Sequence, residues 1–308
     1  MRVAMRLDVH QHLWTEPFLD ALERRSCLPF VRRESGLCMV HVAGEAATAI
    51  DLDSERPARR AGLLERDGVD RALIAMSSPL GVEALPRAEA QRLIAAHLDG
   101  IEALGEPFTA WGPIPLEGLC RDDVDAVLER DCIGVSLPAG AFGAAPAMHV
   151  LSPVFARLEQ RDAPLFIHPG PGMRAPTADS SLADPLWWPA LTRYVAQMQA
   201  AWLSFVTIAR RAHPRLRVVF AMLAGGAPLL SERLAARGGP AVAVTDPCSF
   251  YDTSSYGPVA IEAMARRVGG RQLLYGSDRP VIEPFASGAE AQLRENAGRL
   301  FERTRVAV

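Results

Sequence analysis

Two histidines stand close together near the start of the chain, in a segment that reads Arg-Leu-Asp-Val-His-Gln-His-Leu-Trp. His10 and His12 are two residues apart, so on a β-strand both side chains lie on one face, with Asp8 one step earlier on that face. Imidazoles that converge in this way are typical ligands of a divalent metal ion. The pair alone also fits two partly exposed histidines on a strand, so the hypothesis depends on other residues.

Two further candidate ligands end apolar runs much later in the sequence. His168 follows Ala-Pro-Leu-Phe-Ile, and Asp278 follows Gln-Leu-Leu-Tyr-Gly-Ser. If these runs are parallel strands of one barrel, their carboxyl ends face a shared mouth, where both residues would meet His10 and His12. Three imidazoles and a carboxylate suit a zinc-like ion that keeps a bound water. Taken alone, His168 also fits a capping or core histidine, and Asp278 fits a turn or helix-capping aspartate.

The elements that would position these residues form a regular alternation. Eight short apolar runs alternate with helical stretches, and each run is continuously apolar, as in a sheet covered on both faces. This pattern predicts an α/β fold, a (β/α)8 TIM-like barrel. A doubly wound open sheet is the alternative, but no glycine-rich phosphate motif follows the first strand. The expected strands are residues 1–12, 69–76, 108–114, 132–137, 163–169, 216–223, 250–253 and 272–278, and the expected helices include 87–104, 122–130, 152–161, 191–209 and 259–268.

A long segment separates the first expected strand from the second. Residues 15–65 are interpreted as an insertion with a short hairpin, and a segment of this length at a strand end is often a lid. The sequence shows no internal repeat and no linker that would separate a second domain. We therefore expect residues 1–308 to form a single barrel domain.

The composition excludes several classes of protein. The net charge is −3 and the cations are scattered, which disfavours nucleic acid as a partner. Five cysteines without a C-x-x-C pair indicate neither a disulfide framework nor a zinc ribbon, and a reducing cytoplasm is the expected location. No apolar run approaches membrane-spanning length, and no cleavable signal is expected. All 33 basic residues are arginine, so Schiff-base lysines, a P-loop lysine and a lysine carbamate are excluded.

Five short motifs together resemble the amidohydrolase superfamily over essentially the whole chain. They are Asp-Val-His-Gln-His, Leu-Phe-Ile-His-Pro, the Gly-Gly after the sixth strand, Gly-Ser-Asp-Arg-Pro and the final Asn-Ala-x-x-Leu-Phe. The most similar branch is the amidohydrolase-related group that includes aminocarboxymuconate-semialdehyde decarboxylase. The resemblance implies a distorted (β/α)8 barrel with one divalent metal ion, usually zinc, held by His10, His12, His168 and Asp278. It also implies decarboxylation of aromatic or unsaturated acids, hydrolysis or hydration as the chemistry.

The fourth expected strand bears on the number of metal ions. Binuclear members of the superfamily bridge two ions with a carbamylated lysine on this strand, whereas here it reads Ile-Gly-Val-Ser-Leu. We therefore expect a single divalent ion. Zn²⁺ is the expected metal, with Mn²⁺ or Fe²⁺ as alternatives.

One position departs from the family pattern. Related proteins usually carry a histidine at the end of the sixth strand, where Met222 aligns in this chain. A thioether accepts no proton at neutral pH, so the general acid/base step falls to Asp278, to another group or to no group, and Asp278 is the catalytic candidate. His41, in the insertion, is an alternative if that segment folds over the mouth, although it also fits a surface or hairpin histidine.

Several residues are candidates for contact with a substrate. Trp14 follows the histidine pair, Met222 ends the sixth strand, and Arg279 has the bidentate geometry that binds a carboxylate. Asp252 is either a partner of a metal ligand or a helix cap. Trp187 and Trp188 fit either a lid or a dimer contact, and related proteins are commonly homodimers.

These residues predict a mononuclear metal-dependent hydrolase that acts on a small carboxylated or cyclic substrate through an activated water. The alternative on the same site is a non-oxidative decarboxylase. An alternative of another class is a non-catalytic barrel that binds a metal or ligand, because Met222 replaces the histidine of the sixth strand.

Overall fold

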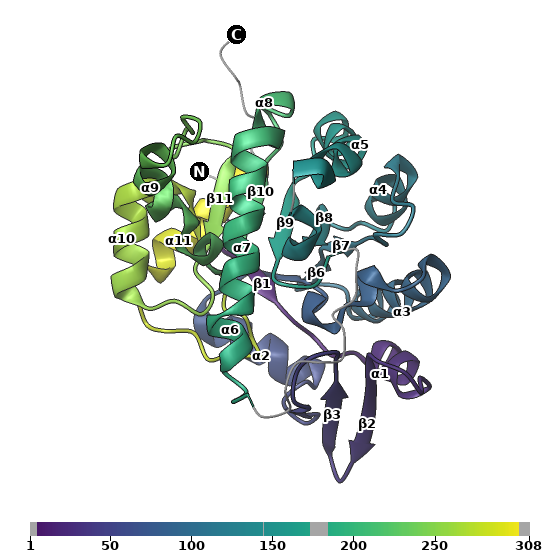
Figure 1. Cartoon of the computed structure of the whole chain (residues 1–308). Helices are drawn as coiled ribbons and strands as arrows, with labels where there is room; N and C mark the ends of the chain where they lie inside the picture. The colour runs from purple at the N-terminus through teal and green to yellow at the C-terminus, as the bar shows by residue number, and fades with distance from the viewer. Residues whose placement is uncertain (1–4, 144, 173–183, 302–308) are drawn as a thin grey trace.

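Eight parallel strands form a closed barrel in the computed structural model, which describes residues 5–143, 145–172 and 184–301 (Figure 1). The strands are β1 (Leu7–Gln11), β5 (Arg71–Ile74), β6 (Phe108–Ala110) continued by β7 (Gly112–Pro113), β8 (Val135–Pro138), β9 (Leu165–His168), β10 (Val218–Phe220), β11 (Ser249–Asp252) and β12 (Leu273–Leu274). The third strand is divided at Trp111, whose backbone N–H still donates to Ile74. The first and last strands are joined where Val9 N–H donates to Tyr275 O and Asp278 N–H donates to His10 O. The predicted (β/α)8 barrel is confirmed.

Helices surround the barrel on the outside (Figure 1). They are α3 (Arg87–Leu104), α4 (Arg121–Leu128), α5 (Ala145–Arg161), α6 (Trp188–Leu191), α7 (Arg193–Ser204), α8 (Arg210–Ala212), α9 (Ser231–Ala236), α10 (Pro258–Val268) and α11 (Glu290–Asn296). The helix expected over 191–209 divides into α6 and α7 and ends in a π-helical turn, Phe205–Ala209. Helix α5 begins earlier than expected and includes Pro153 in its interior.

Short 3₁₀ turns complete the loops. They are η1 (Ser78–Leu80), η2 (Val82–Ala84), η3 (Ala139–Phe142), η5 (Met222–Leu230), η6 (Gly270–Gln272) and η7 (Ala297–Phe301). Strand β10 ends at Phe220 rather than at the expected Leu223, because the backbone turns left-handed from Met222 onward. Five consecutive residues, 222–226, have positive φ, and three of them are not glycine. A left-handed turn is costly for L-residues, so surrounding contacts must hold it.

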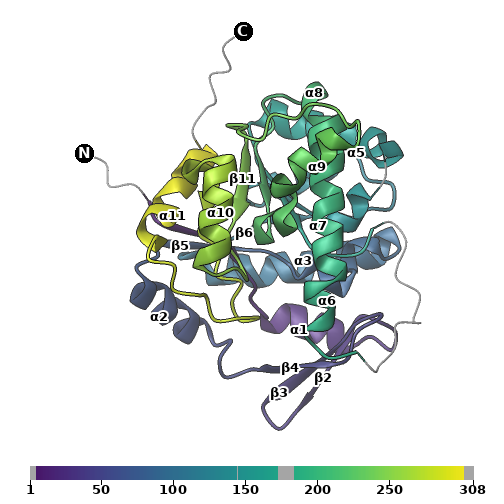
Figure 2. The same cartoon turned by 60° about the vertical axis from the view of Figure 1, so that its left-hand side comes forward.

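The insertion after β1 contains three strands where the sequence predicted a short hairpin. Its elements are α1 (Glu16–Glu23), β2 (Phe30–Glu34), β3 (Leu37–His41), β4 (Thr48–Asp51) and α2 (Pro57–Asp67). Strands β2, β3 and β4 form an antiparallel sheet at the end of the barrel where α6 also lies (Figures 1 and 2). Within β3, Val40 is buried on the face opposite His41, as the alternation of a strand requires.

Aromatic rings fill the interior of the barrel. Trp111 and Phe166 are fully buried and stack with their ring centroids 5.1 Å apart. Phe166 lies 5.1 Å from the ring of His10, and the indole N–H of Trp111 donates to Val9 O. The interior below the histidines is therefore packed with side chains.

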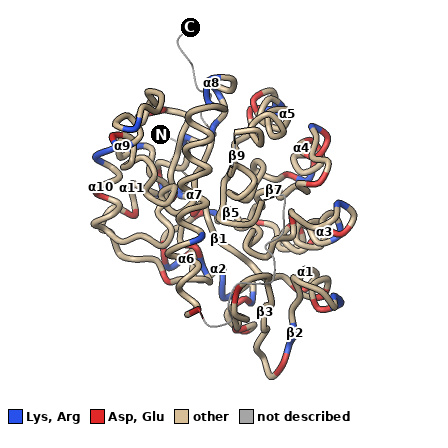
Figure 3. Tube along the Cα trace, viewed as in Figure 1, with Lys and Arg blue, Asp and Glu red and all other residues tan. Residues whose placement is uncertain are grey.

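Charged residues lie mainly on the outside of the molecule. Acidic and basic residues are interspersed on the outer helices, while the barrel strands carry few of them (Figure 3). None of the helices in the described part of the chain has the length and apolar character needed to cross a bilayer.

Candidate metal centre

The four predicted ligands meet at the carboxyl ends of three strands. One ligand atom from each of His10, His12, His168 and Asp278 lies within 4.8 Å of the other three, and all four residues are buried. The Nε2 atoms of His10 and His12 are 3.2 Å apart, and Asp278 Oδ1 lies 3.5 Å and 3.3 Å from them. Ligands at the usual bond lengths of a tetrahedral zinc-like ion are separated by about 3.4 Å. The residues therefore fit one divalent ion.

Each of the three imidazoles forms a hydrogen bond at Nδ1, the nitrogen that faces away from the cluster. Nδ1 of His12 lies 2.8 Å from the carbonyl oxygen of Ala75, and Nδ1 of His168 lies 2.8 Å from that of Pro169. Because a carbonyl oxygen only accepts, both Nδ1 atoms carry the hydrogen. The Nε2 lone pairs are then directed at the centre, as metal binding requires.

His10 has a carboxylate as its partner. Asp252 Oδ2 lies 2.9 Å from its Nδ1, and Asp252 Oδ1 also accepts the backbone N–H of Met222 at 3.0 Å. Gly276 allows this approach, since a Cβ there would lie 3.0 Å from both His10 and Asp252. Asp252 thus joins the metal ligand of the first strand to the left-handed turn after the sixth.

The pKa values of His10, His168 and Asp278 depend on the charges of the neighbouring ligands. Burial opposes the charged imidazolium of His10, but the carboxylates of Asp252 and Asp278 outweigh burial and raise the pKa of His10 to about 9. Burial and the two neighbouring imidazoles hold the pKa of His168 well below its usual range. For Asp278, burial favours the neutral acid, yet the nearby histidines lower the pKa of this carboxyl to about 2. A bound cation would take the place of the protons in this cluster.

Asp8 accepts hydrogen bonds from the backbone and does not face the candidate metal site. One of its oxygens accepts the N–H groups of His10 and Ser277, each at 3.1 Å, and the other accepts Gln11 Nε2 at 2.8 Å. Gln11 in turn accepts from Arg60 at 2.7 Å. Burial raises the pKa of Asp8. This carboxyl closes the barrel between its first and last strands, and it is not one of the four clustered ligands.

A pocket of about 550 Å³ opens above the four ligands. Its described apolar lining comes from the strand ends, the insertion, α6 and α7, and includes Trp14, Val40, Val42, Ile50, Leu80, Leu186, Leu191, Val195, Met222 and Val281. Glu45 and Asp51 are acidic residues of its upper wall, and no arginine is among the described lining residues. We call the ligand end of this pocket the floor, and the part formed by the insertion and α6 the roof.

Two polar contacts of Glu45 connect the roof to α7. Glu45, in the loop between β3 and β4, accepts the hydroxyl of Tyr194 at 2.6 Å and pairs with Arg193 at 2.5 Å. Burial raises the pKa of Tyr194, and the neighbouring Glu45 carboxylate raises it further. The insertion is thereby connected to α7 across the mouth of the barrel.

The predicted substrate contacts are only partly placed in this pocket. Trp14 and Met222 line it. Arg279 does not, because its guanidinium points outward to Asp67 and Glu283, so it is not positioned to bind a substrate. Its predicted role as a carboxylate clamp stays a prediction, which this pairing does not support. A cis peptide bond follows it, before Pro280.

Three other sequence candidates lie away from the floor. His41 stacks on Phe30 with 4.5 Å between ring centroids and is absent from the pocket lining, so it does not replace the missing histidine. Trp187 and Trp188 are exposed at the start of α6, next to the roof. Their predicted role in a lid or dimer contact stays a prediction.

Two polar residues near the site were not singled out from the sequence as site residues. Ser255 donates to Asp278 Oδ2 at 3.0 Å, and Glu45 joins the roof to α7. Ser255 stands three residues after Asp252 in a Thr-Ser-Ser turn, which is a weak signal because serine is common in turns. Glu45 lies in the insertion, where no periodic pattern indicates the direction of a side chain.

The closed parallel barrel and its three-histidine, one-carboxylate cluster place a candidate metal site at the mouth of a TIM barrel. A family model described as amidohydrolase matches residues 7–304, and the chain belongs to this family. None of the curated protein sequences compared with the chain matches it.

Similar solved structures share the fold at low identity. IDCase from Metarhizium anisopliae, in apo form, has a TM-score of 0.73 at 17% identity, covering 97% of this chain and 98% of its own. The 5-carboxyvanillate decarboxylase LigW from Sphingomonas paucimobilis has a TM-score of 0.67 at 16% identity, and the match covers 98% of this chain and 100% of LigW. The 5-carboxyvanillate decarboxylase from Novosphingobium aromaticivorans, complexed with manganese and 4-hydroxy-3-methoxy-5-nitrobenzoic acid, has a TM-score of 0.68 at 17% identity, covering 97% and 94%.

Proposed function

We propose that this protein is a metal-dependent, non-oxidative decarboxylase of a small carboxylic acid with an aromatic or unsaturated body. The observation that carries the proposal is the position of four metal ligands on the floor of a pocket with mainly apolar walls. The solved decarboxylases that share the fold support the same chemistry, and one of them holds manganese and a benzoic acid. This reading replaces hydrolysis as our main hypothesis.

His10, His12, His168 and Asp278 would hold the ion. A divalent cation bound there supplies a Lewis acid that attracts and polarises oxygen atoms of an acidic substrate. Zinc, manganese and iron all accept imidazole and carboxylate ligands, so the ligand set alone does not select among them.

The pocket walls indicate the kind of substrate. Among the described residues that line it, the charged groups outside the ligand cluster are Glu45 and Asp51, both acidic and both on the upper wall. A carboxylate on the substrate would therefore be attracted by the cation on the floor, while the apolar walls favour an uncharged ring or chain. This arrangement suits one acidic group at one end of the molecule.

Asp278 is the group that would move the proton. In decarboxylation the bond between the carboxylate carbon and the substrate body breaks, the electron pair stays on the body, and CO₂ leaves. The carbon of the substrate body that keeps the electron pair then takes one proton, so a single group that accepts a proton from water or a substrate hydroxyl and returns it is sufficient. Asp278 faces both the ligand cluster and the pocket.

The side chain at the end of the sixth strand favours this reading over hydrolysis. Hydrolysis moves two protons, one from the attacking water and one to the leaving group, whereas decarboxylation delivers one proton to a carbon atom. Met222 lines the floor where a second titratable group would be useful, and a thioether exchanges no proton at neutral pH. Decarboxylation needs only one proton at the substrate carbon, which Asp278 would accept from water or a substrate hydroxyl and pass on.

The test is CO₂ release from a panel of aromatic and unsaturated monocarboxylic acids, with metal content measured by elemental mass spectrometry. We expect about one ion per chain, CO₂ release from at least one acid, and loss of more than about 1,000-fold in rate for Asp278→Asn. The control is His10→Ala/His12→Ala, which should lose the ion. Release of an alcohol or amine from esters, lactones or amides without CO₂ would overturn the proposal in favour of hydrolysis. Bound metal without turnover of either panel would favour the non-catalytic barrel.

A further inference from the structure

Ser255 occupies a backbone position that glycine would fill with less strain. Tyr256 N–H donates to Thr253 O at 3.2 Å, which closes a β-turn with Ser255 as its third residue. The φ angle of Ser255 is 63°, in the left-handed region that disfavours side chains. A side chain retained at such a position is explained if it makes a contact that glycine cannot make.

The contact that Ser255 makes is with a metal ligand. Its hydroxyl donates to Asp278 Oδ2 at 3.0 Å, while Asp278 Oδ1 faces His10 and His12. Asp278 itself has a φ of 59°, so it also carries a side chain in the left-handed region that disfavours one. The two oxygens are thereby given different directions, one toward the histidines and one toward the wall of the pocket.

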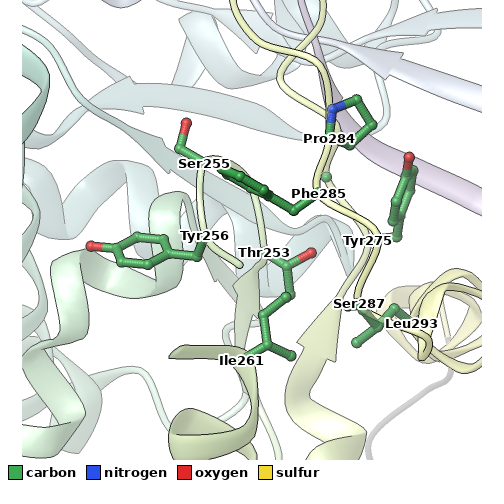
Figure 4. Close-up of a pocket in the computed structure, with 10 residues that line it drawn as sticks. Thr253, Ser255, Tyr256, Ile261, Tyr275, Pro284, Phe285, Ser287 and Leu293 are labelled. Atoms are coloured by element: carbon green, nitrogen blue, oxygen red, sulfur yellow. The ribbon is translucent and has the colours of Figure 1, made fainter. Parts of the chain in front are cut away.

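The surroundings of Ser255 limit the other partners of its hydroxyl. Ser255 lines the substrate pocket on one side and, on the other, a cavity of about 10 Å³. A cavity of this size holds one water molecule at most. Figure 4 shows that Phe285 and Ile261 line the small cavity and that the Ser255 hydroxyl points away from them. The hydroxyl is thus directed to the pocket side, where Asp278 accepts it.

We propose that Ser255 is a positioning residue that fixes the carboxylate of Asp278 for metal binding and for proton transfer. The turn after β11 presents the hydroxyl to Oδ2, and Oδ1 is left in register with the two histidines. The part that concerns proton transfer rests on the proposed decarboxylation, whereas the part that concerns metal binding does not. Loss of a hydrogen bond to a metal ligand typically costs about 10- to 100-fold in metal affinity or activity.

Two substitutions at this position separate positioning from stability. Ser255→Gly removes the hydroxyl and suits the positive φ, whereas Ser255→Thr keeps a hydroxyl but places a β-branched residue in a strained conformation. The matched control is Ser35→Gly, since Ser35 also has a positive φ, 52°, and lies in the turn between β2 and β3. The two glycine variants should therefore change the melting temperature by similar amounts.

The first measurement is the dissociation constant of Mn²⁺ or Zn²⁺, from competition with a chromophoric chelator, beside the melting temperature. We expect Ser255→Gly to bind the ion about 10- to 100-fold more weakly, and Ser255→Thr to bind within about threefold of the unaltered protein despite a lower melting temperature. Ser35→Gly should leave the affinity unchanged. If affinity follows the melting temperature across the three variants, or if Ser255→Gly binds the ion normally, the proposal is wrong.

The second measurement is kcat for CO₂ release at saturating metal, which tests the proton-transfer part. We expect kcat to fall about 10-fold or more for Ser255→Gly and to be largely restored in Ser255→Thr. If no acid is decarboxylated by the unaltered protein, the proposed function fails while the affinity measurement still decides the metal-binding part. If kcat is equal in all variants at saturating metal, Ser255 does not position Asp278 for catalysis.

Discussion

The floor and the roof of the pocket are built in different ways. On the floor, each metal-binding side chain has a second partner: Asp252 for His10, backbone carbonyls for His12 and His168, and Ser255 for Asp278. The roof consists mainly of apolar side chains from β3, β4 and α6, with Glu45 as its polar link to α7. The floor is thus fixed by directional bonds, whereas the roof is held by contacts that tolerate changes of shape.

This difference assigns separate tasks to the two regions. Directional bonds hold ligand atoms in the narrow range of geometries that a metal ion accepts. Apolar contacts accommodate substrates of related shape and set which of them bind. Changes on the floor should therefore alter metal affinity and turnover, and changes on the roof should alter substrate affinity alone.

Among residues that are not themselves candidate ligands, the largest effect is expected on the floor, at Asp252. In Asp252→Asn the amide keeps the volume but loses the charge that stabilises the N–H of His10, and it also disturbs the bond to Met222 N–H. We expect metal affinity to fall about 10- to 100-fold. Equilibrium dialysis against a buffered series of zinc concentrations measures this change. An unaltered affinity for zinc would contradict the idea that directional bonds on the floor hold the metal ligands.

A smaller effect is expected on the roof, at Glu45. Glu45→Ala removes the contacts to Arg193 and Tyr194, worth about 1 kcal/mol or more, so KM should rise about fivefold while kcat and metal content stay unchanged. Steady-state kinetics with the best acid of the panel provides the measurement. Glu34→Ala, at an exposed position of β2 that does not line the pocket, is the control. A fall in kcat with constant KM would show that the roof takes part in chemistry.

The smallest effect on activity is expected at Glu83, which is fully buried and has one carboxylate oxygen that accepts no hydrogen bond from the residues that the structure describes. Ser78 donates to its other oxygen at 2.6 Å. Burial outweighs this hydrogen bond and raises the pKa of Glu83 from 4.5 to about 7. The folded protein keeps the proton up to about pH 7, whereas the unfolded chain loses it near pH 4.5. The free energy of unfolding should therefore fall as the pH rises between these values.

Glu83→Gln removes this dependence because the amide stays neutral. At pH 8 the variant should be more stable than the unaltered protein by up to about 3 kcal/mol, and the difference should shrink toward pH 4.5. Chemical denaturation at both pH values measures it, and CO₂ release should be unchanged. A stability difference that is the same at both pH values would contradict the raised pKa.

The barrel and the four clustered ligands were predictable because they depend on local patterns. The alternation of apolar runs with helices defines a parallel barrel, and the barrel brings the strand ends around His10, His168 and Asp278 together. The direction of Arg279 was not predictable in the same way. It follows Asp278 directly, and when the aspartate faces the mouth its neighbour faces outward, where Asp67 and Glu283 neutralise it.

Other features of the site depend on contacts between distant segments. From the sequence alone, Asp252 is either a partner of a metal ligand or a helix cap, and its pairing with His10, 242 positions away, is decided by tertiary structure. The contact of Glu45 with Tyr194 likewise joins the insertion to α7. The third strand of the insertion and the left-handed turn at Met222 are similar cases. Such features are determined by tertiary packing, to which residue types and spacing give little access.

The stacked rings of Trp111 and Phe166 have a consequence for exchange between the pocket and solvent. Because they fill the barrel directly beneath His10, the described residues close the pocket below the four candidate ligands. An ion held by those ligands would lie at the deepest point of the pocket, with any bound substrate above it. A bound organic ligand would therefore have to dissociate before the ion could leave the pocket.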